Sequence, residues 1–108
     1  MPRFQKLAAL AAVVGAAASA QAQQLSPQEA MLARNLAATC ANCHGTNGVA
    51  RGDMKPLAGV SAGKITAMLA DFKSGAQPAT IMHQIAKGYT DDQIRLIAGY
   101  YAALPAAK

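Results

Sequence analysis

The sequence predicts an all-α protein of about four helices. Two capping boxes, Ser26–Glu29 and Thr90–Gln93, mark helix starts. Apolar residues recur at the three- and four-residue spacing of one helix face, and glycines and prolines separate these segments. No stretch shows the alternation of apolar and polar residues that is typical of a half-buried strand. With 108 residues, the chain has room for one domain.

The first expected helix runs from Pro27 to about Cys40. Ser26 can cap this helix, Pro27 suits its first position, and Glu29 can reach back to the capping amide. The following segment, residues 45–59, is rich in glycine and contains one proline. We therefore expect it to be a loop.

A second helix is expected between Ser61, which can cap it, and Gly75, which can end it. One face of this helix is apolar and carries Ile65, Met68, Leu69 and Phe72 at positions i, i+3, i+4 and i+7.

Two further helices complete the predicted fold. A short helix over residues 79–87 follows Pro78 and stops at Gly88. The last helix begins at the Thr90 capping box, has two acids in its first turn, and stops before Pro105. Its apolar face carries Ile94, Ile97, Tyr101 and Leu104.

Residues 1–22 have the features of an export signal. Two basic residues, without an acid, precede an uncharged apolar run over residues 7–18, and Ala-x-Ala spacing ends at Ala20 or Ala22. The run is shorter than the ~20 residues that span a bilayer. We expect a signal peptide to be cleaved and to leave a periplasmic domain, residues 23–108, without a transmembrane segment. The alternatives are a buried N-terminal helix or a retained membrane anchor.

Cys40-Ala41-Asn42-Cys43-His44 has the C-x-x-C-H spacing of covalent haem attachment. Two cysteines three residues apart on a helix can direct both sulfurs to one side, where they can add to the two vinyl groups of one porphyrin. His44 follows directly and can bind the iron. We therefore expect one haem c, which would also fill a core that has five aromatic residues and no Trp.

Other uses of the two cysteines fit the sequence less well. A thioredoxin-type C-x-x-C lies in a βαβ context, and no strand is expected here. A structural zinc site needs four ligands, and the two thiols with His44 and His83 would only just supply them. A disulfide across two residues would be strained and needs no adjacent histidine.

The second axial ligand must come from elsewhere in the chain. Met82 shares an apolar helix face with Ile85, Ala86 and Tyr89, so it is the residue we expect to face the haem. His83 is rotated about 100° from Met82, toward a polar side, and Met54 lies in the glycine-rich loop. Met54, His83 and an open position remain as alternatives. We expect Met31 to lie on the wrong side of the motif and Met68 to fill the core.

The ring N–H of an iron-binding histidine is ordinarily held by an acceptor. For His44 we expect a backbone carbonyl within residues 55–59, with Pro56 as the first candidate. The alternative is that Pro56 only stiffens the loop.

These motifs together resemble the class I c-type cytochromes over residues 25–105. Residues 72–75 and Met82 with Ala86-Lys87 are similar to the cytochrome c4 and c-553 group. The run from residue 80 to 92, with Ala98–Tyr101 and Leu104-Pro105, resembles the cytochrome subunit of flavocytochrome c sulfide dehydrogenase.

The resemblance implies a class I cytochrome c fold with Cys40 and Cys43 as haem thioethers and His44 and Met82 as axial ligands. It also implies an FAD-containing sulfide dehydrogenase subunit as electron donor and a downstream redox protein as acceptor. Some members carry two haem motifs, whereas this chain has one C-x-x-C-H. A free c-553 or c4-type electron shuttle is therefore the alternative function.

With His44 and Met82 filling both axial positions, we expect electron transfer rather than catalysis by this chain alone.

The charge also excludes one class of partner. Ten basic and five acidic residues give +5, but removing residues 1–22 leaves eight basic residues, and two haem propionates bring the charge to about +1. We therefore expect no nucleic-acid partner.

Overall fold

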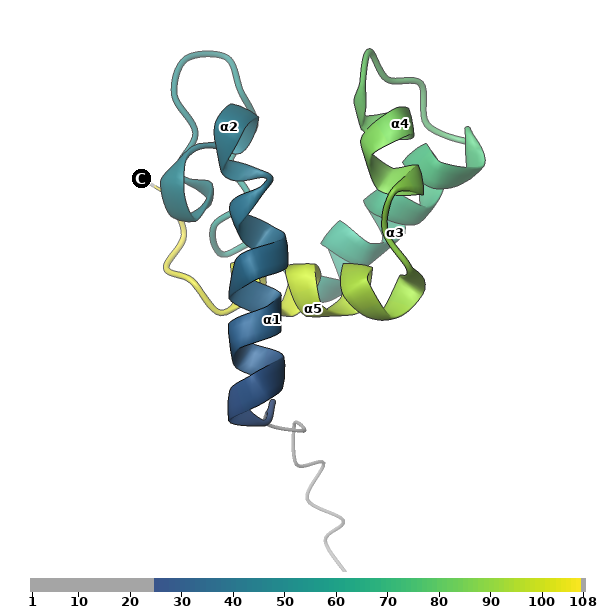
Figure 1. Ribbon diagram of the computed structural model, residues 1–108. Coiled ribbons are helices and arrows are strands. Elements are labelled where there is room, and N and C mark those ends of the chain that lie inside the picture. Colours follow the sequence, from purple (N-terminus) through teal and green to yellow (C-terminus); the bar gives the residue numbers. More distant parts are fainter. Residues whose placement is uncertain (1–24, 108) are drawn as a thin grey trace, which may run out of the picture.

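The structure is a computed structural model that describes residues 25–107. Its elements are α1 (Pro27–Ala38), α2 (Ala41–His44), the short 3-10 turn η1 (Thr46–Gly48), α3 (Ala62–Ser74), α4 (Met82–Lys87) and α5 (Asp91–Ala102). No strand occurs among these residues, so the all-α prediction is confirmed (Figure 1). The signal-peptide prediction lies outside the described residues.

Both predicted capping boxes are formed, one at the start of α1 and the other at the start of α5. The Ser26 hydroxyl accepts from the Glu29 amide at 3.2 Å, and the Glu29 carboxylate accepts from the Ser26 amide at 3.0 Å. Thr90 and Gln93 make the same reciprocal pair at 3.1 and 2.9 Å. Ser61 caps α3, as expected. Side chains thus satisfy amides that helix starts leave without partners.

The short helix before Gly88 begins later than predicted. α4 starts at Met82 rather than at Ala79, because the first carbonyl to accept helical hydrogen bonds is that of Ile81. Ile81 has no side-chain oxygen with which to cap the helix, so the sequence carries no start signal at this point. α2 is a separate helical turn that also has no capping side chain. The sequence analysis did not separate it from the helix before it or the loop after it.

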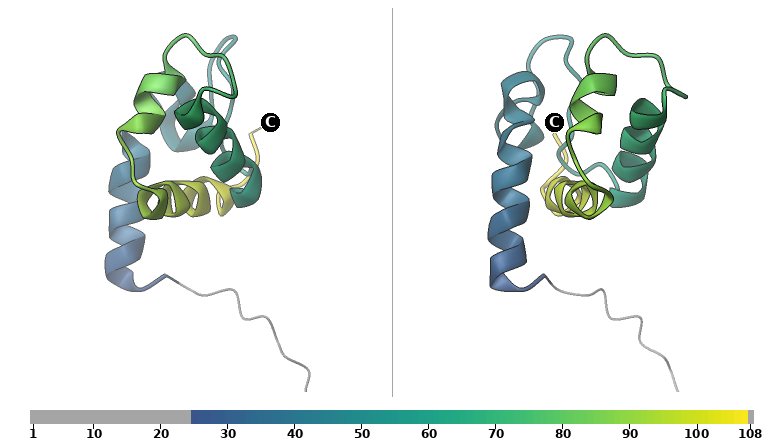
Figure 2. Two further views of the ribbon diagram at one scale, coloured as in Figure 1. Left: turned by 90° about the vertical axis from the view of Figure 1, so that its right-hand side faces the viewer. Right: turned by 45° about the vertical axis from the view of Figure 1, so that its right-hand side comes forward.

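α5 is the helix on which both α1 and α3 pack. In Figure 1 α5 runs across the lower part of the fold, with α1 passing one end and continuing below it, α2 above α1, and α3 and α4 rising at the other end. Figure 2 shows the same arrangement from two further sides. The central buried cluster consists of Ala37, Ile65, Ile97, Ala98 and Tyr101. The two sides of the fold are therefore joined through the buried face of α5.

Small side chains bring α1 close to α5. Ala33 and Ala37 are buried completely or nearly so, and the Tyr101 hydroxyl donates to the Ala37 carbonyl at 2.6 Å. This bond ties the end of α1 to the middle of the core. Among the described helices, none has the length and apolar character needed to cross a bilayer.

Candidate functional site

The C-x-x-C-H motif forms one turn of helix directly after α1. Cys40 is the residue before α2, and its carbonyl accepts from the His44 amide at 2.9 Å. Cys40 is partly buried, Cys43 is exposed, and neither is in a disulfide. The two thiols and the histidine thus lie within five residues on one helical turn and the residue before it.

Burial has a clear effect on Cys40. It raises the pKa of the Cys40 thiol, because the charged thiolate loses solvation. The nearby side chains of Thr39 and Tyr101 oppose this shift only partly. The position thus favours an uncharged sulfur, and a thioether is such a group.

The chain changes direction immediately after His44. Gly45 has φ 82° and ψ 160°, a backbone conformation that is essentially limited to glycine. A Cβ at this position would lie 2.0 Å from the Val49 carbonyl oxygen. The sharp turn separates the histidine from the loop that follows and lets this loop fold back beside it.

The loop that returns from Gly45 holds the imidazole of His44. Nδ1 of His44 lies 2.7 Å from the Lys55 carbonyl oxygen. A carbonyl only accepts hydrogen bonds, so Nδ1 carries a proton, and in the neutral imidazole the lone pair is on Nε2. His44 is thus held in the tautomer that a histidine needs to bind a metal through Nε2.

The carbonyl that accepts from His44 lies in the predicted segment, residues 55–59, but it belongs to the residue before the first candidate, Pro56. Pro56 was expected to accept from His44, whereas the structure assigns this role to Lys55. Proline restricts the preceding residue to extended backbone conformations. Pro56 therefore contributes by limiting the directions in which the Lys55 carbonyl can point.

Backbone hydrogen bonds anchor the loop over residues 45–59. The Gly48 carbonyl accepts from the amides of Leu57 and Ala58 at 3.0 and 3.2 Å, and the Gly59 amide donates to the Tyr101 carbonyl at 2.9 Å. The carbonyl that orients His44 thus belongs to a loop that is fixed on itself and on α5.

Met82 is the first residue of α4 and is partly buried. In Figure 1 α4 and the upper part of the loop after α2 both lie above α5, at opposite ends of it. Several large apolar side chains in these two segments remain exposed: Val49 by 51%, Met54 by 45%, Ile81 by 56% and Ile85 by 37%. Exposed apolar groups in both segments suit contact with a planar, largely apolar ring.

The residues present therefore fit a haem c. Cys40 and Cys43 supply thiols for two thioether bonds, and His44 has its free Nε2 lone pair. Met82 supplies a neutral thioether from the other side of the fold, and it stays the predicted second ligand.

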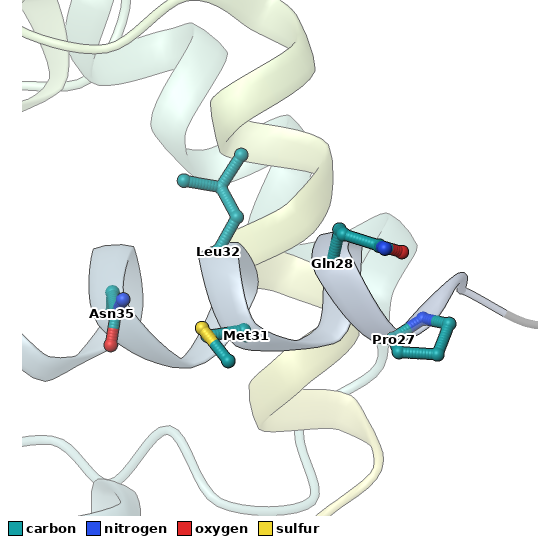
Figure 3. Close-up of a pocket in the computed structure, with 5 residues that line it drawn as sticks. All are labelled: Pro27, Gln28, Met31, Leu32 and Asn35. Atoms are coloured by element: carbon teal, nitrogen blue, oxygen red, sulfur yellow. The ribbon is translucent and has the colours of Figure 1, made fainter.

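Two methionines that the sequence analysis set aside as ligands, Met31 and Met68, lie where it suggested. Met31 is 67% exposed on α1, on the helix side opposite the buried Ala33 and Ala37. Figure 3 shows the pocket that it lines with Pro27, Gln28, Leu32 and Asn35. Met31 precedes Cys40 by nine residues, about 13 Å along a helix, so it lies well away from Cys40. Met68 is partly buried in α3, which agrees with a packing role.

His83 differs from its predicted placement on the polar side of α4. The residue is only partly exposed, and its Nδ1 atom is buried without a hydrogen-bond partner among the described residues. Its neighbours Gln84 and Lys87 are exposed, as expected. Helical rotation alone therefore placed His83 wrongly, because α3 packs against this short helix and covers part of its surface.

The zinc interpretation is not supported by the described residues. In residues 25–107, no group of three or more His, Cys, Asp or Glu side chains is placed to hold a metal ion. His44 and His83 therefore do not complete a four-ligand site with the two cysteines.

One contact near the motif was missed by the sequence reasoning. The hydroxyls of Thr39 and Tyr89 lie 2.6 Å apart, although 50 positions separate them in the chain. Tyr89 was assigned to the apolar face of the Met82 helix, and no sequence signal links it to the residue before Cys40. Only the folded arrangement of α1 and α4 brings the two together.

The chain is similar in sequence to several named cytochromes and sulfur-oxidation proteins. The cytochrome subunit of sulfide dehydrogenase from Chlorobaculum tepidum is 42% identical over 69 residues, which cover 64% of this chain and 63% of that protein. The thiosulfate dehydrogenase electron acceptor of Stutzerimonas stutzeri is 36% identical over 102 residues, covering 90% of this chain and 47% of that protein. Cytochrome c-552 of Acidithiobacillus ferridurans is 38% identical over 65 residues, covering 60% and 28%. This chain thus spans less than two thirds of the length of these relatives.

The fold has a similar solved structure as well. Cytochrome c4 of Acidithiobacillus ferrooxidans matches with a TM-score of 0.61 and 32% identity, covering 68% of this chain and 50% of that chain. No family model matches the sequence.

Proposed function

We propose that this chain, which belongs to the class I c-type cytochromes, carries single electrons on one haem c attached through Cys40 and Cys43. The observation that carries the proposal is the His44 imidazole, in the same C-x-x-C-H turn as the two thiols, with Nδ1 held by the Lys55 carbonyl at 2.7 Å. The cytochrome c4 structure supports the class I fold predicted from the sequence.

His44 and Met82 are the proposed axial ligands. The haem supplies a one-electron Fe(III)/Fe(II) couple when bound. The Lys55 carbonyl fixes the imidazole ring and raises the basicity of His44. The neutral thioether of Met82 favours the ferrous state relative to a second histidine. If His44 and Met82 both held the iron, no position would be left for oxygen or peroxide, which would suit electron transfer rather than catalysis.

The proposal is tested on protein purified from the compartment in which it matures. We expect the intact mass to exceed that of the polypeptide by one haem, and a redox titration to follow a one-electron curve. The double variant Cys40→Ala/Cys43→Ala is the control and should carry no covalent haem. A native protein without added haem mass would overturn the proposal, as would a ferrous protein that binds carbon monoxide directly.

The proposed electron donor is an FAD-containing sulfide dehydrogenase flavoprotein. Support comes from the similarity to the Chlorobaculum tepidum cytochrome subunit and from the sequence resemblance described above. We expect such a flavoprotein to co-purify with this chain at a fixed ratio, and sulfide to reduce the haem in the complex but not in the isolated chain. A downstream redox protein would then receive the electrons.

A free periplasmic carrier of the c-553 or c4 type is the second candidate. It is favoured by the similarity to the Stutzerimonas stutzeri thiosulfate dehydrogenase electron acceptor, which covers 90% of this chain. A carrier would purify alone and bind partners briefly through small interfaces, below about 1,200 Å². Co-purification therefore separates the two functions.

The proposed location is the periplasm, with a mature domain over residues 23–108. N-terminal sequencing of the exported protein tests this directly. Cleavage after Ala20 or Ala22 is expected, and a retained Met1 would contradict it. The maturation of c-type haem outside the cytoplasm fits such export.

A further inference from the structure

We propose that Tyr89 and Thr39 form a side-chain latch that positions Met82 relative to the haem attachment turn. The latch joins two parts of the fold. The attachment wall is residues 27–44, which end in His44, and the methionine wall is residues 62–87, which include Met82. The inference rests on the proposed His44–Met82 ligation and assigns Tyr89 and Thr39 as positioning residues.

The direction of the hydrogen bond follows from the contacts of Thr39. The Thr39 hydroxyl donates to the Leu36 carbonyl at 2.9 Å, and a hydroxyl has only one proton to give. The Tyr89 hydroxyl must therefore donate to Thr39 Oγ1, at 2.6 Å. Because Thr39 directly precedes Cys40, the acceptor is part of the turn that begins the haem attachment motif.

The other end of Tyr89 is held by the methionine wall. Its backbone carbonyl accepts from Nζ of Lys73 in α3 at 2.6 Å, in a partly buried position. Lys73 also lies 3.7 Å from the Asp91 carboxylate, but Asp91 is fully exposed, so this ion pair adds little. The Tyr89 amide in turn donates to the Ala86 carbonyl of α4. Tyr89 is thus bonded to α3, α4 and the residue before Cys40.

The Tyr89–Thr39 bond lies where it can limit the movement of Met82. α1 and α3 both pack on α5, and α4 packs on α3, so α5 joins the two walls (Figure 1). A movement of the methionine wall about α5 would change the separation of Met82 from His44. Tyr89 directly precedes Thr90, which caps α5, so the Tyr89–Thr39 bond is a side-chain link between the two walls beside the start of α5 and resists such a movement. Removing it should make Met82 easier to displace from the iron.

The test uses the native, haem-loaded protein and imidazole as a competitor for the Met82 position. Tyr89→Phe keeps the ring and removes the hydroxyl. We expect the affinity of the ferric protein for imidazole to rise about 2- to 13-fold, the range that one net hydrogen bond contributes. Thr39→Val should give the same increase. Thr39→Ser, which keeps the hydroxyl, should have the wild-type affinity. The double variant Tyr89→Phe/Thr39→Val should show no further increase, because each change removes the same bond.

Tyr100→Phe is the matched control. The Tyr100 hydroxyl bonds to Asn47 Oδ1 at 2.9 Å, a contact between α5 and the turn after α2 that does not reach the methionine wall. This variant should leave imidazole affinity unchanged. If Tyr89→Phe and Thr39→Val lower the denaturation midpoint but leave imidazole affinity at the wild-type value, the latch is refuted and both residues are only structural. If the wild-type spectrum does not depend on Met82, the proposed ligation fails first, and the latch falls with it.

Discussion

Replacing Gly45 with alanine should destabilise the folded protein by about 2–6 kcal/mol. Two costs add at this position. The backbone at φ 82° and ψ 160° is nearly forbidden to residues with a Cβ, at about 1–3 kcal/mol. The new Cβ would also lie 2.0 Å from the Val49 carbonyl oxygen and 2.6 Å from its carbon. Both atoms belong to backbone, so relief requires the loop beside His44 to move, at a further cost of about 1–3 kcal/mol.

Gly52→Ala is the matched control for this substitution. Gly52 also has a positive φ, 61°, but an added Cβ would meet no atom within 4 Å. Only the left-handed backbone cost of about 1–2 kcal/mol then applies. Chemical denaturation of the two haem-loaded variants measures the difference, provided that the slope of free energy against denaturant is unchanged. Equal destabilisation by the two substitutions would refute the reasoning from the Val49 contact.

Three further substitutions test separate contacts. Tyr101→Phe should cost only about 1 kcal/mol in denaturation, because the Ala37 carbonyl keeps its backbone partner. Burial raises the pKa of Tyr101, so the folded state binds this proton more tightly than the unfolded state does. The resulting stability is complete below about pH 10 and is lost as pH rises toward the folded pKa, by up to about 1.4 kcal/mol per pH unit; a wild-type slope equal to that of Tyr101→Phe would contradict this. Pro56→Ala frees the backbone of Lys55 and should lower the free energy of unfolding by about 0.4–1 kcal/mol; an unchanged denaturation midpoint would show that Pro56 does not restrict Lys55. Ser26→Ala should cost about 1 kcal/mol and speed amide exchange in the first turn of α1, whereas unchanged exchange there would mean that the capping box contributes nothing.

Features with local causes could be predicted from the sequence. The two capping boxes depend on residues three positions apart, and the structure forms both. The C-x-x-C-H turn is equally local, since one helical turn brings Cys40, Cys43 and His44 together. The end of α3 at Gly75 follows from the left-handed conformation there, at φ 84°. In each case the interacting groups are near neighbours in the chain.

Features that depend on tertiary contacts were harder to predict. The segment that orients His44 was identified, but the choice between Lys55 and Pro56 depends on how the loop closes. The partly buried ring of His83 reflects the packing of α3 on α4 and cannot be read from helical rotation. The Tyr89–Thr39 bond joins residues 50 positions apart and has no sequence signature.

The central claim is that His44 and Met82 are the axial ligands of one covalently bound haem. The most direct measurement is the proton NMR spectrum of the reduced native protein, in which an iron-bound methionine shows a methyl signal strongly shifted by the haem ring current. We predict that this signal is present in the wild type and in Met54→Ala, and absent in Met82→Ala. A signal that persists in Met82→Ala, or that disappears in Met54→Ala instead, would contradict the account.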